Sequence, residues 1–236
     1  MRNAMTRTDS GDFALPKIPV SNTPDEFRIR RIFCVGRNYA DHAAEMGAEV
    51  DRDAPFYFTK SPFAYCASGS EIPYPPGTSN LHHEVELVVA LGASVFHCDK
   101  AQANQAIYAF GCGLDLTRRD LQQIAKDTRR PWDTGKDFEN SAILGPLTLA
   151  SDAGQLEGKR IELKVNGAVR QSAVLDDMVW TVEEIIMHLS TLYHLVPGDV
   201  IMTGTPAGVG PLKVDDVLEG SIDGLTDITL KILPAE

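Results

Sequence analysis

The sequence predicts an α+β protein in which a mixed or antiparallel β-sheet curls into a roll, with short helices around it. Apolar segments of strand length recur along the chain, and few helical segments lie between them to connect parallel strands. The pair Asn166-Gly167 stands between alternating apolar and polar residues, which is a strong signal for a β-hairpin. A doubly wound α/β fold is therefore disfavoured, because it needs strands and helices in regular alternation.

The N-terminal part of the chain is expected to be small and partly irregular. The first 25 or so residues are rich in Pro, Ser, Thr, Asn and Asp, which predicts a loop-like lead-in. Two apolar strands should follow, separated by a short helix that ends at a glycine: 31–36, 38–47 and 56–60. The proline-rich connector 72–80 predicts a boundary between a small segment, 1–75, and a main domain, 76–236.

The main domain is expected to be rich in strands. Strands are predicted at 84–92, 111–117, 199–204, 214–224 and 225–233, with a hairpin over 161–173. Helices are predicted at 100–110, 118–130 and 181–195. In the last of these, Thr181 and Glu184 have the spacing of a capping box. The polar stretch 130–146 is typical of a functional loop rather than of a linker.

Composition excludes some classes of function. The 236-residue chain is 43% hydrophobic and 23% charged, which is ordinary for a globular protein with a substantial core. Its formal charge of −11 argues against a general binder of nucleic acid or of anionic membranes. The sequence shows neither a membrane-spanning run nor a secretory signal, so a cytoplasmic location is expected. Reduced, mostly buried thiols are expected for the four cysteines: Cys34, Cys66, Cys98 and Cys112.

Two glutamates stand at the head of an apolar strand. Glu84 and Glu86 begin an otherwise apolar run, and residues two apart in a strand point to the same side. Two buried carboxylates that lie close together repel each other, and a divalent cation with hard oxygen ligands removes the conflict. The simpler alternative is a pair of solvated glutamates on a wet face of the sheet.

A third carboxylate strengthens the metal hypothesis. Asp115 ends the apolar stretch GCGLDLT, whose glycines allow another group to approach closely. Together with the two glutamates it would supply an incomplete oxygen shell, with positions left for water and substrate. Taken alone, Asp115 is equally explained as the N-cap of the helix that follows.

Five stretches of the chain resemble motifs of a known family. The stretches HHEVEL, GLDLTRRDLQ, GKDFENSAILGP and GDVIMTGTPAGVGP resemble the fumarylacetoacetate hydrolase family, and CVGRNYADHAAEM is similar to the acylpyruvase branch. Each motif is weak alone, but five in the right order are specific, and together they run from about Arg31 to the C-terminus. The resemblance implies the mixed β-sandwich roll of that family's C-terminal domain and, for the assembly, a homodimer.

The resemblance also implies roles for particular residues. Metal ligands would be Glu84, Glu86 and Asp115, holding Mg2+, with Mn2+ as the alternative. Lys136 would stabilise an oxyanion, although without the resemblance it is interpreted as a solvated loop lysine. Residues that bind the substrate would be Arg119, Gln122, Gly204 and Thr205.

His42 and Glu45 match the pair that activates water in the acylpyruvase branch. Their spacing of three places them on one side of a short helix, where Glu45 would orient His42 as a base. From the residues alone an exposed ion pair is the simpler interpretation. The polar stretch 47–53 that follows is predicted to act as a lid over the metal.

The expected activity is metal-dependent hydrolysis of the carbon–carbon bond of an acylpyruvate, a 2,4-dioxo acid. Fumarylpyruvate, giving fumarate and pyruvate, is the leading substrate hypothesis. Oxaloacetate decarboxylation and isomerisation of a related unsaturated dicarboxylic acid are enzymatic alternatives that would use the same metal. The non-enzymatic alternative is a metal-dependent binding protein for a small 2-oxo acid.

Overall fold

Two large mixed β-sheets form the body of the protein. The structure, a computed structural model, describes residues 14–45, 47 and 52–236. The eight-stranded sheet has the order β4 (Phe56–Lys60), β3 (Arg31–Gly36), β15 (Asp199–Met202), β8 (Val85–Leu91), β9 (Ile107–Asp115), β11 (Ala142–Leu144) and β5 (Tyr65–Ala67), with β12 (Thr148–Leu149) beside β9. The five-stranded sheet has the order β14 (Ala168–Val174), β13 (Arg160–Val165), β17 (Val217–Ile222), β18 (Ile228–Leu233) and β6 (Ser70–Pro73).

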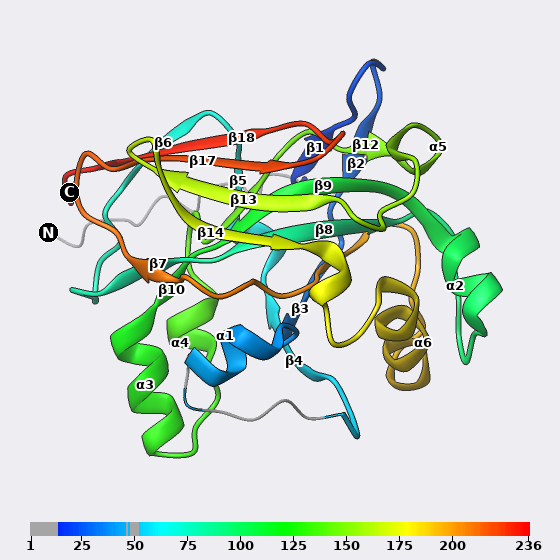
Figure 1. Ribbon diagram of the computed structural model, residues 1–236, viewed down its shortest axis with the longest axis horizontal. Helices are drawn as coiled ribbons and strands as arrows, with labels where there is room; N and C mark the ends of the chain where they lie inside the picture. The colour runs from blue at the N-terminus through cyan, green and yellow to red at the C-terminus, as the bar shows by residue number, and fades with distance from the viewer. Residues whose placement is uncertain (1–13, 46, 48–51) are drawn as a thin grey trace, which may run out of the picture.

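Parallel pairs occur in both sheets, between β3 and β15, β5 and β11, and β6 and β18, while the other strand pairs described in these sheets are antiparallel. The predicted α+β class with a mixed sheet is therefore confirmed. Figure 1 shows the five-stranded sheet crossing the upper part of the molecule, with β8 and β9 running alongside it.

Alternate side chains of β8 contribute to two separate hydrophobic cores, one on each face of the sheet. Val85, Leu87 and Val89 pack in the cluster that includes residues of the five-stranded sheet, whereas Val88 and Ala90 pack in a second cluster. Successive side chains of a strand point to opposite faces, so every residue of β8 is buried. Glu86 shares the face of Val88 and Ala90, which places a carboxylate beside the second core.

Short helices close the two ends of the sheets. Figure 1 shows α1 (Ala40–Glu45), α3 (Arg119–Asp127) and α4 (Asp133–Lys136) gathered below one end, and α2 (Lys100–Ala106) and α6 (Val182–Leu192) at the other. The predicted capping box of α6 is confirmed: the Thr181 hydroxyl accepts the Glu184 amide N–H, and the Glu184 carboxylate accepts the Thr181 N–H at 2.9 Å. The described residues also include α5 (Ala150–Ala153) and the 3-10 turns Pro62–Ala64 and Leu175–Asp177.

Some local predictions were wrong. The expected loop-like lead-in contains an antiparallel hairpin, β1 (Lys17–Pro19) and β2 (Glu26–Arg28), because Ile18 and Phe27 are buried against the second core. The helix expected over 100–110 ends at Ala106, where an apolar run starts β9 and pairs with β8. The predicted functional loop 130–146 contains α4 and β11.

A small three-stranded sheet lies next to α3 and α4, with the order β10 (Thr117–Arg118), β7 (Leu81–His83) and β16 (Gly210–Pro211).

All four cysteines are free and buried, as predicted. The division of the chain near residue 75 stays a prediction. Among the described residues, no helix has the length and apolarity needed to cross a bilayer.

Candidate metal centre and active site

The three predicted carboxylates converge in the folded protein. Glu84 lies between β7 and β8, Glu86 lies in β8, and Asp115 ends the neighbouring antiparallel strand β9. The Asp115 N–H donates to the Glu84 carbonyl at 2.8 Å, which fixes the two strands in register at this point. One oxygen from each carboxylate lies within 4.8 Å of the others, and the three residues are at most 5% exposed. Their burial excludes the alternative of two solvated glutamates.

Asp115 does not cap the helix that follows it. The N-cap position of α3 is Arg118, which makes no capping hydrogen bond through its side chain. Asp115 Oδ2 instead accepts from Lys136 Nζ at 2.6 Å, and Asp115 Oδ1 lies 2.8 Å from Lys60 Nζ. The second contact is an ion pair without hydrogen-bond alignment, since Oδ1 has no hydrogen-bond partner.

Positive side chains surround two of the three carboxylates. Lys136 Nζ also donates to Glu84 Oε2 at 2.7 Å, and the Arg119 guanidinium contacts Glu84 Oε1. Burial would raise the pKa of Glu84, but the charges of Lys136 and Arg119 outweigh it and the pKa is lowered. Burial would likewise lower the pKa of Lys136, and the charges of Asp115 and Glu84 raise it instead. Lys136 is therefore a charged, buried member of the cluster rather than a solvated loop lysine.

Glu86 is the least compensated of the carboxylates. Burial, together with the charges of Asp115 and Glu84, raises its pKa well above the usual value. Its Oε2 accepts the Gly204 amide N–H at 2.8 Å, but that dipole does not offset the repulsion. A divalent cation between these oxygens would remove the conflict, and an all-carboxylate donor set suits Mg2+ or Mn2+. The residues therefore fit a hard divalent cation.

Arg119 and Gln122 lie on one face of α3 and line the same cavity as Glu84 and Glu86. Arg119 Nη1 donates to Gln122 Oε1 at 2.6 Å, and both side chains are buried. This arrangement follows from their spacing, because residues three apart share a helix face. The carboxylate cavity, as we name it, is lined by Val35, Gly36, Arg37, His42, Phe58, Glu84, Glu86, Arg119, Gln122, Lys126, Trp132, Lys136 and Thr205.

Gly204 was expected from the resemblance to bind the substrate, but in the structure its amide contacts a carboxylate of the cluster. The amide is occupied by Glu86, so Gly204 holds a carboxylate of the cluster in this structure. Its φ of +97° is in the region that favours glycine, and a Cβ there would stand 3.0 Å from the Val35 carbonyl. The neighbouring Thr205 is 2% exposed and lines the carboxylate cavity.

His42 enters the carboxylate cavity from α1. Its side chain is 8% exposed, and its Nδ1 lies 3.6 Å from Glu45 Oε2, which is an ionic distance but too long for a hydrogen bond. Burial lowers the pKa of His42, so the imidazole is neutral and able to accept a proton near neutral pH. Glu45 Oε2 accepts the Gly208 N–H at 3.0 Å, which ties α1 to the loop after β15. The predicted lid 47–53 lies mostly outside the described residues, since 48–51 are not among them.

Lys60 and Gln171 are site residues that sequence reasoning missed. Lys60 ends β4 and is 2% exposed; its ammonium donates to Ser141 Oγ at 3.0 Å besides its contact with Asp115. A lysine at the end of an apolar strand was the available signal, but its partners lie more than fifty residues away in the sequence. Gln171 lies in the hairpin strand β14, where nothing local points to the site.

The orientation of the Gln171 amide is fixed by its neighbours. The Val85 N–H can only donate, so the atom 3.1 Å away is Gln171 Oε1, which also contacts His83 Nδ1 at 3.0 Å. Gln171 Nε2 then donates to Thr205 Oγ1 at 2.7 Å and to the Pro206 carbonyl at 2.8 Å. Because Thr205 Oγ1 accepts this bond, its own hydroxyl hydrogen is free to be donated to an anion in the carboxylate cavity.

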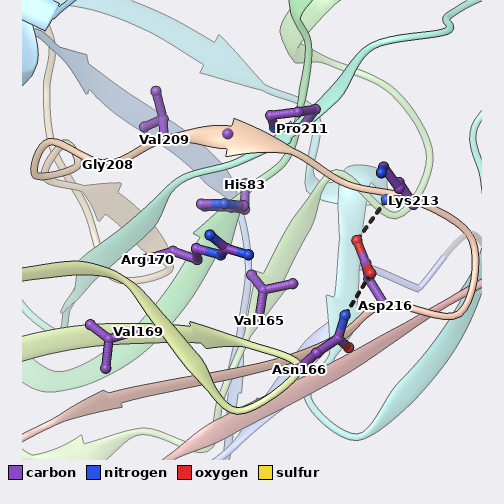
Figure 2. Close-up of a pocket in the computed structure, with 11 residues that line it drawn as sticks. His83, Val165, Asn166, Val169, Arg170, Gly208, Val209, Pro211, Lys213 and Asp216 are labelled. Atoms are coloured by element: carbon purple, nitrogen blue, oxygen red, sulfur yellow. Dashed lines mark hydrogen bonds between the residues drawn. The ribbon is translucent and has the colours of Figure 1, made fainter.

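A second, larger cavity lies on the other side of this hydrogen-bond chain. Figure 2 shows it between the β13–β14 hairpin and the segment from Gly208 to Pro211, with His83 and Arg170 directed into it. It has a volume of about 690 Å³ and contains none of the predicted site residues. Asp216 at its edge accepts bonds from the Asn166 side chain at 2.8 Å and the Lys213 N–H at 2.7 Å. His83 therefore connects this cavity, through Gln171, to Thr205.

Similarity to known proteins agrees with this geometry. Residues 31–233 match the family model described as fumarylacetoacetate (FAA) hydrolase C-terminal. A fumarylpyruvate hydrolase from Ralstonia sp is 47% identical over 193 residues, which is 81% of this chain and 100% of that protein. A mitochondrial oxaloacetate tautomerase from Mus musculus is 38% identical over 207 residues, covering 88% of this chain and 93% of that protein.

A solved structure is similar over almost the whole chain. The crystal structure of fumarylpyruvate hydrolase from Pseudomonas aeruginosa, in complex with Mn2+ and pyruvate, superposes with a TM-score of 0.91. The two sequences are 38% identical, and the match covers 98% of this chain and 100% of that one.

Proposed function

The chain belongs to the fumarylacetoacetate hydrolase family, and from this premise we propose that it is a metal-dependent hydrolase of acylpyruvates, with fumarylpyruvate as the substrate. The observation that carries the proposal is that His42 lines the same cavity as Glu84 and Glu86, two members of the carboxylate cluster. A neutral, buried imidazole beside a candidate metal centre is suited to activate a water molecule. The relative at 47% identity supports the choice of substrate.

Glu84, Glu86 and Asp115 would hold the divalent cation, which when bound supplies Lewis-acid stabilisation of the negative charge that develops on the 2-oxo acid. Mg2+ is the expected ion; Mn2+ is supported by the complex of the Pseudomonas aeruginosa protein. Arg119 binds the substrate carboxylate with its guanidinium, and Thr205 donates its free hydroxyl hydrogen to the same group. These two contacts fix the pyruvate end of the substrate.

His42 then removes a proton from water, and the resulting hydroxide attacks the C4 carbonyl. The positive charge formed on His42 is stabilised by the Glu45 carboxylate, 3.6 Å away. Lys136 and Gln122 donate to the oxyanion at C4. The bond between C3 and C4 breaks, its electron pair passes to the enolate of pyruvate, and the acyl group leaves as a carboxylic acid. Transfer of the proton held by His42 to C3 completes pyruvate and returns His42 to its neutral form.

The decisive experiment mixes the purified protein with fumarylpyruvate and follows the loss of the dienol absorbance, with fumarate and pyruvate measured as products. The expected result is rapid loss with Mg2+ or Mn2+ and none after EDTA treatment. A His42→Ala variant should keep metal and oxalate binding but lose product formation. No metal-dependent loss of absorbance in the wild type would overturn the proposal, and turnover by His42→Ala at the wild-type rate would overturn the role of His42.

A second candidate is chemistry on oxaloacetate, because relatives at 36% to 38% identity are oxaloacetate tautomerases. Tautomerisation moves a proton between carbon and oxygen and decarboxylation releases CO2, so neither needs an attacking water. The same assay with oxaloacetate, resolved into enol loss and CO2 release, separates these activities from hydrolysis. Binding of 2-oxo acids without turnover of any of them would favour the binding-protein alternative. The expected homodimer stays a prediction.

A further inference from the structure

The carboxylate cavity has two chemically different ends. At its inner end the groups that the proposed mechanism uses are almost fully buried: Glu84 is 5% exposed, Glu86 1% and Lys136 2%. At its outer end the lining includes Arg37, which is exposed, and Lys126, which is half-buried. The proposed mechanism gives no role to these two cations.

Arg37 and Lys126 come from different elements and lack acidic partners. Arg37 follows β3, and Lys126 lies in the last turn of α3. Within the described residues, neither has a carboxylate oxygen within 4.0 Å. Burial lowers the pKa of Lys126, and the positive charges of Arg119 and Arg37 lower it further, so the cations are close enough to repel one another. A bound anion would offset this repulsion.

Simpler explanations cover only part of these observations. A lysine in the last turn of a helix interacts favourably with the helix dipole, and Lys126 Nζ lies 5.1 Å from the centre of the Trp132 ring. Neither effect explains why Arg37 is brought to the same cavity. Its guanidinium carbon lies 5.9 Å from the Phe56 ring centre, at the outer limit of a cation–π contact.

Arg37 has a backbone conformation that non-glycine residues rarely adopt. Its φ is +60°, a value that is uncommon and energetically unfavourable for residues other than glycine. The next residue holds it there: the Asn38 side chain donates to the Thr203 carbonyl at 2.8 Å and accepts the Trp180 N–H at 2.7 Å. Strained residues that their surroundings hold in this way are concentrated at functional sites.

We propose that Arg37 and Lys126 form a second carboxylate subsite, which binds the free carboxylate at the far end of the acyl group. This inference rests on the proposed function and narrows it: the substrates are acylpyruvates whose acyl group itself ends in a carboxylate. Fumarylpyruvate has such a group, and acetylpyruvate does not. Phe58 and Trp132, whose ring centres are 5.9 Å apart, line the cavity as well and provide apolar surface for the carbon chain between the two anionic ends.

The experiment compares kcat/KM for fumarylpyruvate and acetylpyruvate with Mn2+ in the wild type and in variants. Arg37→Asn removes the charge and keeps a residue that tolerates positive φ, and Lys126→Met removes the charge with little change in shape. Hydrogen bonds to charged groups contribute about 1.5–3 kcal/mol, so the ratio of the two kcat/KM values should fall by about ten- to a hundredfold in each variant. Lys126→Arg, which retains the charge, should retain most of the preference.

Arg129→Asn is the matched control. Arg129 is exposed, has φ of +54° and does not line the carboxylate cavity, so the same substitution there should leave the ratio unchanged. Inhibition gives an independent measurement: fumarate should inhibit Arg37→Asn and Lys126→Met at least tenfold more weakly than the wild type. Circular dichroism verifies folding, and if one of the two charge-removing variants fails to fold, the other still tests the subsite.

Two failures can be told apart. A wild type that cleaves both substrates, with the same ratio and the same fumarate inhibition in the charge-removing variants, would overturn the subsite and leave the hydrolase proposal standing. A wild type that cleaves neither acylpyruvate would overturn the proposed function, and the subsite with it.

Discussion

Glu86 differs from the other two carboxylates in the charges that surround it. Glu84 and Asp115 each contact lysine or arginine, whereas no basic side chain of the described residues lies within 4.0 Å of Glu86. Its raised pKa follows from burial and from the two neighbouring carboxylates. A bound cation would therefore stabilise the negative charge of Glu86 more than that of Glu84 or Asp115.

Glu86→Gln should remove metal binding without destabilising the metal-free protein, because it removes the poorly compensated charge and keeps the shape. At a hundred times its Kd, Mn2+ should stabilise the wild type by about 2.7 kcal/mol, and the variant far less at the same concentration. Thermal unfolding with and without Mn2+ measures this. Glu219→Gln, an exposed glutamate in β17, is the control and should respond to Mn2+ like the wild type. An undiminished Mn2+ shift in Glu86→Gln would contradict the metal assignment.

His42 should set the acidic side of the pH–rate profile. Burial lowers its pKa below the ordinary value of 6.5, so the neutral form that accepts a proton persists to lower pH than for an exposed histidine. The fall of kcat/KM toward acid should therefore have its midpoint below pH 6.5. His42→Ala should lower kcat by about 10²–10⁴-fold and abolish this fall. A midpoint well above 6.5, or the same acidic fall in His42→Ala, would show that another group is responsible.

Gln171 should act on the substrate through Thr205. Gln171→Met removes the donor that orients the Thr205 hydroxyl, so oxalate binding in the presence of Mn2+ should weaken by up to about tenfold. In a Thr205→Val background the same substitution should have little further effect, because the hydroxyl that it orients is absent. Calorimetric titration of the four proteins measures this coupling. Gln123→Met, on the exposed side of α3, is the control, and strictly additive effects would contradict the link.

At the scale of elements, the loop between β15 and β16 is the main connector of the site. Two of its backbone amides bind glutamates of the site. The Gly204 N–H donates to Glu86, the candidate metal ligand, at 2.8 Å, and the Gly208 N–H donates to Glu45, the neighbour of His42, at 3.0 Å. Gly208 has φ of +96°, and a Cβ there would stand 2.0 Å from the Arg170 carbonyl of β14. The loop therefore sits directly against the hairpin strand that carries Gln171.

Gly208→Ala should move this loop and lower both stability and activity. Gly158→Ala is the matched comparison, since Gly158 has φ of +72° with nothing within 4 Å of the added Cβ. Backbone strain alone should cost Gly158→Ala roughly 1–2 kcal/mol in the free energy of unfolding, and overpacking should cost Gly208→Ala a further 1–3 kcal/mol or so. Urea denaturation and kcat measure the two effects. Equal free energies of unfolding for the two variants would show that the β15–β16 loop accommodates the added methyl group without strain.

Elements with local signals were predictable from the sequence. The Asn166-Gly167 hairpin and the capping box at Thr181 need only neighbours in the chain, and both are present. The β1–β2 hairpin and the early end of α2 were missed because burial against distant strands decides them. The carboxylates were predictable because Glu84 and Glu86 stand two residues apart at the head of an apolar run. Lys60 and Gln171 reach the site through strand pairings with distant segments, which leave no local pattern.

At the scale of the whole molecule, the site and the core are one structure. The carboxylate cavity is lined by residues of β3, α1, β4, β8, α3, α4 and the loop after β15, and the strands β4, β3 and β8 belong to the eight-stranded sheet. A site built in this way depends on the sheet that carries it. The acidic net charge of −11 makes local cations such as Arg119 and Lys136 the means by which an anionic substrate is attracted.

Loss of the site should therefore coincide with global unfolding. Trp132 lines the carboxylate cavity, so its fluorescence reports on the site, while far-UV circular dichroism reports on the sheets. The two urea transitions should coincide, and Mn2+ with oxalate should shift both by the same amount. Trp180→Phe leaves Trp132 as the sole tryptophan for this measurement. A fluorescence transition at clearly lower urea would instead indicate a site that opens by itself.

The parallel pairing of β3 with β15 has a consequence for biosynthesis. Arg31 stands opposite Asp199, and their side chains form an ion pair at 2.5 Å across a chain separation of 168 residues. During translation, β3 emerges early and waits with one edge unpaired until β15 has left the ribosome. Because β15 also stands between β3 and β8, a nascent chain that stops short of residue 199 has no continuous sheet. Completion of the eight-stranded sheet therefore waits for β15, which is inserted between β3 and β8 after both have been made.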